Sequence, residues 1–163
     1  YLRELYSNRI ARIKERMPNA CIGVDVIVGF PGESQDHFLE SYDFLLNLDV
    51  SYLHVFPYSE RKNTTAVKLP NKVSKVEKTL RAKQLRSLSE KKKRKFYESQ
   101  LGQECSVLWE SEPQDGGKMY GFSENYLRFS RAFDQKRINQ TENLLFDQID
   151  AEGFAVSKAA ALV

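Results

Sequence analysis

The stretch Gly23-Val-Asp-Val-Ile-Val-Gly-Phe-Pro-Gly32, followed by Glu33 and Ser34, decides the fold of this chain. Its β-branched run is broken only by Asp25 and ends in a Gly-Phe-Pro-Gly turn, and a helical pattern begins at Ser34. This order predicts a buried parallel strand, a tight turn and a helix. Ligands of α/β folds bind at the carboxyl ends of such strands, so the turn at 29–34 is the first candidate site.

A second strand and two helices surround this stretch. Apolar side chains at helical spacing predict helices at 2–17 and 34–48, and Tyr-Leu-His-Val-Phe-Pro at 52–57 predicts a second strand. The order is that of a right-handed crossover between two parallel strands. Two parallel strands do not make a stable sheet alone, and the chain begins at Tyr1 rather than Met. We therefore expect a piece of a longer protein whose N-terminal part is missing.

The second half of the chain changes from helix to short strands. Ser74 and Glu77 have the spacing of a capping box at the start of a long basic helix, 74–100. After it, short apolar runs separated by turns predict an antiparallel barrel. The predicted fold class is therefore α/β at 1–100, as an incomplete parallel sheet ending in the basic helix, and a small antiparallel β-barrel at 101–163. The predicted strands of the barrel span 104–110, 118–122, 126–129, 144–150 and 154–157.

Positive charge is concentrated in the long helix. Residues 72–95 carry 11 basic and two acidic side chains, whereas 96–163 carry six and 11. Such a basic stripe is typical of a surface that holds RNA phosphates, although most charge runs are solvated helix faces. In the helix, we expect the RNA-binding residues to be Lys91, Lys92, Lys93, Arg94 and Lys95. In the acidic second half, RNA would need a local patch such as Arg128, Arg131, Lys136 and Arg137, with Tyr126, Phe129 or Phe133 as stacking rings or, alternatively, as core.

Two classes of protein are disfavoured by composition. No stretch approaches the ~20 apolar residues of a membrane span. The two cysteines, Cys21 and Cys105, lie far apart and lack the spacing of metal ligands. We expect them to be free thiols in a cytoplasmic protein that neither enters a membrane nor binds a metal through this chain.

The two strand motifs also carry a family resemblance. The amino-acid sequence of these motifs is similar to that of the radical-SAM methylthiotransferases and their C-terminal TRAM domain. It is most similar to the branch that acts on threonylcarbamoyladenosine in tRNA. The residues that carry it are Asp25-Val-Ile-Val-Gly-Phe-Pro-Gly-Glu33, Leu53-His-Val-Phe-Pro-Tyr-Ser59, Arg61, Thr65-Ala66, Tyr120-Gly-Phe122 and Asn125-Tyr126. Asn63 stands where the family has glycine, which predicts a left-handed residue there.

The resemblance implies an enzyme that uses S-adenosylmethionine and two 4Fe–4S clusters to methylthiolate an adenosine beside the anticodon of tRNA. The family's Cys-x-x-x-Cys-x-x-Cys, which holds the radical-generating cluster, is absent from this sequence. We therefore expect the chain itself to be inactive and to hold neither cofactor. Two alternatives stay open: a methylthiotransferase acting on a ribosomal protein, as a sister branch does, and a module without enzyme activity that binds RNA or protein.

The resemblance further implies that the ends of the two strands line the S-adenosylmethionine site. The implied residues are Gly29, Phe30, Pro31, Gly32, Glu33, Val55, Phe56 and Tyr58. Arg61 is a candidate for binding a carboxylate of the substrate or cofactor, or a solvated loop residue. The residues alone also fit a plain strand-to-helix turn and core packing of Phe56. Asp25, which must be paired if it is buried, and His54 are each structural or part of the site.

Overall fold

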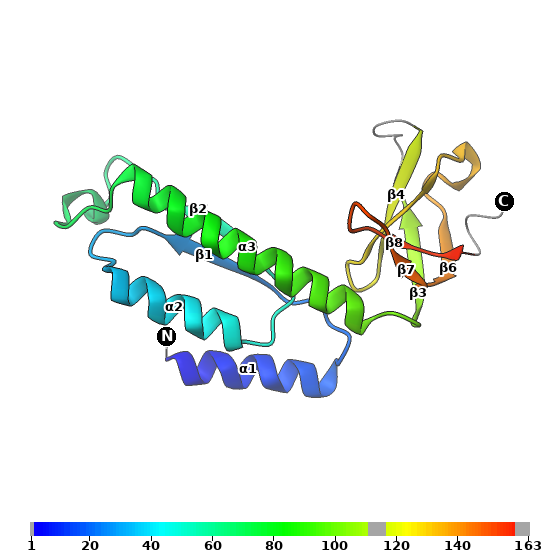
Figure 1. The fold of residues 1–163 in the computed structure, drawn as a ribbon, viewed down its shortest axis with the longest axis horizontal. Helices are drawn as coiled ribbons and strands as arrows, with labels where there is room; N and C mark the ends of the chain where they lie inside the picture. The colour runs from blue at the N-terminus through cyan, green and yellow to red at the C-terminus, as the bar shows by residue number, and fades with distance from the viewer. Residues whose placement is uncertain (1, 111–116, 159–163) are drawn as a thin grey trace. The chain divides into compact units, whose positions relative to one another are not determined.

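The computed structural model of the chain describes residues 2–110 and 117–158 (Figure 1). The chain divides into two compact units, each with its own apolar core. The first unit comprises residues 1–18 and 22–93, and the second comprises 19–21 and 94–163. The long helix α3 (Lys75–Ser99) belongs to both, because it continues from one unit into the other.

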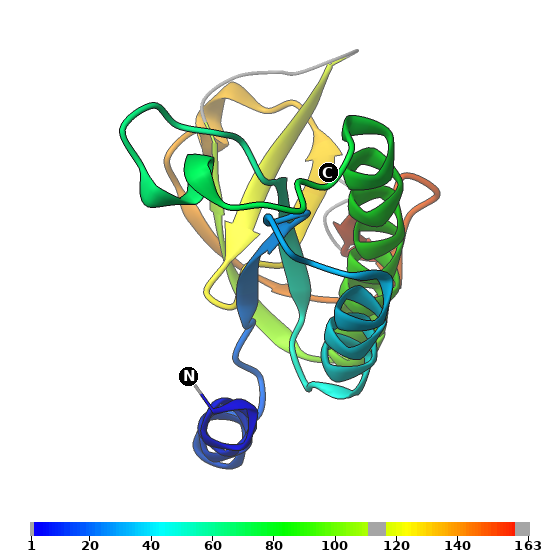
Figure 2. The ribbon, with the colours of Figure 1, turned by 90° about the vertical axis from the view of Figure 1, so that its left-hand side faces the viewer.

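The first unit is a pair of parallel strands with helices packed on it. Its elements follow one another as α1 (Arg3–Arg16), β1 (Gly23–Val28), α2 (Gln35–Asn47) and β2 (Tyr52–Pro57). The strands pair in parallel from Gly23 opposite Tyr52 to Val28 opposite Pro57. Figure 2 shows α2 and α3 on the same side of this pair, where Phe38, Leu45 and Leu85 are buried. The predicted α-β-α-β order is confirmed.

The described residues cover β1 on one face only, so within this chain it is not the buried strand that its composition predicts. Val24, Val26 and Val28 face the core, whereas Asp25 and Ile27 alternate with them on the outer face. Ile27 is 63% exposed there, because the described helices pack on the other face. Asp25 is exposed as well and needs no buried partner.

The second unit is a six-stranded sheet in the order β6-β3-β4-β5-β8-β7. All neighbouring strands are antiparallel except β5 and β8. Across the described ranges 2–110 and 117–158, no ladder joins β6 to β7, so antiparallel pairing is confirmed but the sheet is not a closed barrel. Its strands are β3 (Glu104–Trp109), β4 (Lys118–Ser123), β5 (Arg128–Ala132), β6 (Thr141–Leu145), β7 (Gln148–Ile149) and β8 (Ala155–Val156).

Two strand boundaries differ from the prediction. The strand predicted from Tyr126 begins at Arg128, because Tyr126 has a left-handed backbone (φ 63°) and belongs to the preceding turn. The strand predicted at 144–150 is divided between β6 and β7, and β6 starts earlier, at the polar residue Thr141. β6 tolerates polar residues because it lies at the edge of the sheet, where its outward side chains meet solvent. The Pro, Asp and two Gly residues at 113–117 also predict a turn, and of these residues only Gly117 is among those that the structure describes.

Side-chain hydrogen bonds cap the N-terminal ends of α2 and α3. Ser34 Oγ accepts a hydrogen bond from His37 N (3.1 Å), and Ser34 N donates to His37 Nδ1 (3.4 Å), which completes a capping box on α2. At α3, Ser74 Oγ accepts from Glu77 N (3.1 Å), as predicted. The Glu77 carboxylate, however, pairs with an arginine one turn further along the helix.

No described helix has both the length and the apolar composition that crossing a bilayer requires.

Candidate cofactor-binding strand ends and basic helix

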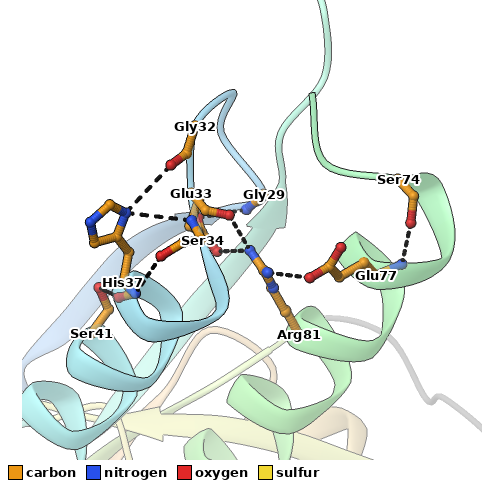
Figure 3. Close-up of polar contacts among 9 residues, drawn as sticks. All are labelled: Gly29, Gly32, Glu33, Ser34, His37, Ser41, Ser74, Glu77 and Arg81. Carbon is orange, nitrogen blue, oxygen red and sulfur yellow. Dashed lines mark hydrogen bonds and ion pairs between the residues drawn. The ribbon is translucent and has the colours of Figure 1, made fainter. Parts of the chain in front are cut away.

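A buried arginine holds the turn after β1 in place (Figure 3). Arg81 on α3 has a side chain that is 4% exposed, and its Nη1 donates to Glu33 Oε1 (2.8 Å) and to the Glu33 carbonyl (2.9 Å). Its Nη2 pairs with the Glu77 carboxylate. The second carboxylate oxygen of Glu33 accepts from Gly29 N (2.8 Å). Glu33, predicted as a cofactor residue, therefore closes its own turn and ties that turn to α3.

Gly29 is required by its backbone and by a close neighbour. Its φ of 80° is left-handed, and a Cβ added there would clash with Cγ of Lys78. Lys78 continues past Gly29 and donates from Nζ to the carbonyl of Tyr58 (3.3 Å). At Gly29, which was predicted to line the cofactor site, the close neighbour in this structure is thus a lysine of α3.

Two of the predicted cofactor residues, Phe30 and Tyr58, meet where the strands end. Tyr58 N donates to the carbonyl of Val28 (2.8 Å), which brings the two strand ends together. The rings of Phe30 and Tyr58 meet edge to face with centroids 5.1 Å apart. The Tyr58 hydroxyl is buried with no hydrogen-bond partner among the described residues, and the Phe30 side chain is exposed. This corner therefore combines an aromatic surface with one unused polar group.

The remaining predicted cofactor residues are dispersed. Phe56 is exposed on the outer face of β2, whereas Val55 points the other way and packs against the core. Pro31 is buried, and Gly32 N donates to the carbonyl of Asn71 (2.9 Å). The structure thus separates Val55 from the aromatic corner.

The loop that carries Arg61 has the predicted conformation at one position. Asn63 has a φ of 68°, which confirms the left-handed residue expected there. The carbonyl of Arg61 accepts from Thr64 Oγ1 (2.9 Å), while the Arg61 side chain is exposed. A role for Arg61 in binding a carboxylate stays a prediction.

Asp25 and His54 are directly opposite each other on the uncovered face of the strand pair. Both are exposed, and the His54 ring lies edge to face against Tyr52 with centroids 4.9 Å apart. In the described part of the chain, no group of three or more His, Cys, Asp or Glu is placed to hold a metal ion. The structure gives neither residue a metal-binding role.

The two cysteines do not fit an iron–sulfur cluster. Neither is in a disulfide: Cys21 is at intermediate exposure, and Cys105 is buried in the core of the second unit. Burial raises the pKa of the Cys105 thiol to about 11, whereas a ligand must be a thiolate. A 4Fe–4S cluster is held by several cysteine thiolates, and this chain has two cysteines in all.

The basic run of α3 separates into exposed and structural lysines. Lys91, Arg94 and Lys95 are exposed, and Arg94 makes an ion pair with Glu98 one turn on (2.7 Å). Lys92 instead donates from Nζ to two carbonyls at the end of α2, those of Leu46 (3.1 Å) and Leu48 (2.7 Å). Lys93 is half-buried. At least one basic residue of this run, Lys92, therefore stabilises the first unit.

The two predicted RNA-binding arginines of the second unit lie on opposite faces of β5. Arg131 points inward, is 5% exposed, and donates from Nη1 to Glu142 Oε2 (2.9 Å). Arg128 points outward and lies over aromatic rings. Arg128 and Arg131 are three residues apart, and successive side chains of a strand point to opposite faces of the sheet. The two arginines therefore do not lie on the same surface. RNA contact by either one stays a prediction.

Comparison with known proteins finds relatives that are similar to this chain over part of their length. No family model matches the chain. The threonylcarbamoyladenosine tRNA methylthiotransferase of Aquifex aeolicus is 44% identical over 108 residues, which are 66% of this chain and 26% of that protein. The protein of the same name from Bacillus subtilis is 30% identical over 131 residues, 78% of this chain and 29% of its own length. This chain is similar to part of the methylthiotransferases.

The similarity to methylthiotransferases extends across their branches. The ribosomal protein uS12 methylthiotransferase of Alkaliphilus oremlandii is 35% identical over 114 residues, 70% of this chain and 26% of that protein. The chain thus spans between about a quarter and a third of the length of the methylthiotransferases it matches. The resemblance inferred from the strand motifs is confirmed at the level of partial similarity to these enzymes.

One consequence of the geometry concerns Lys92. Replacing Lys92 with methionine should lower the free energy of unfolding by about 1 kcal/mol, because the carbonyls at the end of α2 lose a cationic donor. Urea unfolding followed by far-UV circular dichroism would measure the loss. Lys91→Met is the matched control, since Lys91 is exposed, and it should change stability by less than about 0.5 kcal/mol. Equal effects of the two substitutions would contradict the capping role.

Proposed function

We propose that this chain is the last part of a radical-SAM methylthiotransferase that modifies threonylcarbamoyladenosine beside the anticodon of tRNA. The observation that carries the proposal is the 44% identity over 108 residues to an enzyme of that name. In this proposal, residues 1–100 are the end of the radical-SAM barrel, and 101–163 are a TRAM domain that helps bind RNA. The whole enzyme acts in the cytoplasm.

The aromatic corner at the strand ends supports a place for S-adenosylmethionine. Phe30 offers an exposed ring, and the buried Tyr58 hydroxyl has no partner in the described residues. An adenine has an apolar face and polar edges, which suit such a pair of rings. S-adenosylmethionine supplies the methyl group and the radical when it is bound. The residues of this chain would bind and orient it.

The two 4Fe–4S clusters require cysteines that this chain does not have. Its two thiols do not fit a cluster, so the ligands must come from outside residues 1–163. We therefore expect the chain alone to be inactive as a methylthiotransferase. Within the whole enzyme, this chain would line one side of the cofactor site and supply some of the residues that bind RNA.

A second candidate is a methylthiotransferase that acts on a ribosomal protein. The 35% identity to the uS12 methylthiotransferase over 114 residues favours it. The exposed basic residues of α3 instead favour the first candidate, with tRNA as the substrate. Lys91, Arg94 and Lys95 can neutralise RNA phosphates and release counterions. A module that binds RNA or protein without any enzyme activity would share these features, so the substrate must be tested directly.

The test is binding of the full chain to tRNA at several salt concentrations. Replacing Lys91, Arg94 and Lys95 together with alanine should weaken binding at least tenfold at low salt and reduce the slope of log K against log salt by about 3. The matched control removes the same charge from α1, as Arg9→Ala, Arg12→Ala and Arg16→Ala, three exposed residues. It should leave the affinity nearly unchanged.

The outcomes separate the candidates. Equal losses in the two triple variants would mean that tRNA is held by overall charge rather than by α3. Absence of tRNA binding at low salt, together with binding of ribosomal protein uS12, would favour the second candidate and overturn the first.

A further inference from the structure

The outward face of the second unit carries an arginine packed among aromatic rings. The guanidinium carbon of Arg128 lies 4.6 Å from the ring centroid of Tyr120, 5.3 Å from that of Phe154 and 5.8 Å from that of Phe122. Phe122 and Arg128 are direct neighbours across β4 and β5. On the other side of Phe122, Leu108 is opposite it in β3 and is exposed. On this side of the sheet, Tyr120 is buried, Phe122 and Phe154 are half-buried, and Leu108 is exposed, so apolar side chains surround one cation.

Arg128 has no anionic partner in the part of the chain that the structure describes. No ion pair engages its guanidinium there, and its Nε is buried without a hydrogen-bond acceptor. A buried Nε without an acceptor is shared with Arg81 and Arg137, so the ion pair is what distinguishes Arg128: Arg131 on the inner face pairs with Glu142, whereas Arg128 pairs with no described carboxylate. The rings hold the Arg128 guanidinium without using its hydrogen-bond donors, so those donors remain available to an acceptor from outside the chain.

Tyr126, at the end of this face, is held in a strained and exposed position. Its φ of 63° is unusual for a bulky residue, and the residue is 68% exposed. Ser123 enforces the turn: its carbonyl accepts from Tyr126 N (3.0 Å), and its Oγ accepts from Leu127 N (2.9 Å). The Tyr126 ring contacts Phe122 at a centroid distance of 6.1 Å. Packing gains little from a ring that is mostly in solvent, so packing does not account for the strain.

We propose that this aromatic–arginine face (Tyr120, Phe122, Tyr126, Arg128 and Phe154) binds an unpaired RNA base. Tyr126 stacks on the base, and the guanidinium of Arg128 donates to the phosphate next to it. Proteins that bind single-stranded RNA use exposed rings and arginine planes on sheets in this way. The second half of the chain carries 11 acidic and six basic residues from 96 to 163, so stacking rather than bulk charge must supply the affinity there. The inference rests on the proposed RNA role and assigns it a site.

The test compares two RNAs of about ten nucleotides, one unstructured and one of the same length with abasic sites, by fluorescence anisotropy with the full chain. Tyr126→Asn removes the ring and keeps a residue that tolerates left-handed backbone. It should weaken binding of the intact RNA by roughly 5- to 100-fold and leave the melting temperature unchanged or higher. Tyr126→Phe should bind as the wild type does. Leu145→Ala, which removes an exposed apolar side chain of the same unit, should also leave binding unchanged.

Binding of the abasic RNA gives the decisive contrast. It should be weaker than binding of the intact RNA for the wild type and should be the same for wild type and Tyr126→Asn. If Tyr126→Asn binds intact RNA as the wild type does, while the α3 triple alanine variant has lost tRNA, the site on this face is wrong and the proposed function stands. If the wild type binds neither RNA nor tRNA at low salt, both are wrong.

Discussion

Replacing Arg81 with methionine should lower the free energy of unfolding by about 3 to 5 kcal/mol, because it leaves a carboxylate without its partner inside the protein. Arg81 is 4% exposed in its side chain, and Glu33 is 16% exposed. The guanidinium carbon of Arg81 lies 5.4 Å from the ring centroid of Phe38, and methionine keeps a long apolar side chain at this position, so the loss mainly reports the charge and its hydrogen bonds. Urea unfolding followed by the helical signal at far-UV wavelengths would measure it.

Two further variants isolate the Arg81–Glu33 pair. Glu77→Gln removes the half-exposed partner of Arg81 and should cost no more than about 1 kcal/mol. Glu33→Gln keeps an oxygen that can accept from Gly29 N but removes the charge, so Arg81→Met combined with Glu33→Gln should be more stable than Arg81→Met alone. A double variant no better than the single one would show that an uncompensated carboxylate is not the cause.

Local signals in the sequence predicted the local structure. Ser34 caps α2, β2 spans the predicted residues, and Asn63 is left-handed, since each depends on neighbours within a few positions. The exposed face of β1 was not predictable in the same way. A run of valines and isoleucine has strand composition whichever face is covered, and covering depends on elements distant in the chain.

The basic residues of α3 show why a charge count does not identify an interface. Arg81 and Lys92 contribute to the same run as Lys91 and Lys95, but each ends on an acceptor more than 40 positions away, in Glu33 or at the end of α2. The spacing of Glu77 and Arg81 by four residues was visible in the sequence and predicts pairing on a helix. The longer-range partner Glu33 had no such signal.

The two faces of β5 were, by contrast, available from the sequence. Arg128 and Arg131 differ by an odd number of positions, so any strand through them puts one inside and one outside. What the sequence did not contain is where the strand begins. Tyr126 has strand composition, and only the turn held by Ser123 removes it from β5.

Replacing Glu142 with glutamine should lower the free energy of unfolding of the second unit by about 3 kcal/mol. The Glu142 carboxylate accepts from the Arg131 guanidinium (2.9 Å), from Trp109 Nε1 (3.1 Å) and from Arg137. Glutamine has nearly the same shape but no charge, so the buried Arg131 would lose the carboxylate with which it pairs. Trp109 is the single tryptophan and one of these donors, so its fluorescence during urea unfolding reports on this unit directly.

The same substitution separates a structural role of Arg131 from a role in RNA binding. If Arg131 is structural, Glu142→Gln and Arg131→Met should both lose stability while the folded fraction binds RNA with unchanged affinity. Arg137→Gln is the matched control, because Arg137 shares the Glu142 carboxylate but is 27% exposed, and it should cost much less stability. A fall in RNA affinity for Arg131→Met under conditions where it is fully folded would instead mean that Arg131 leaves Glu142 to reach the RNA, against a buried position that is 5% exposed.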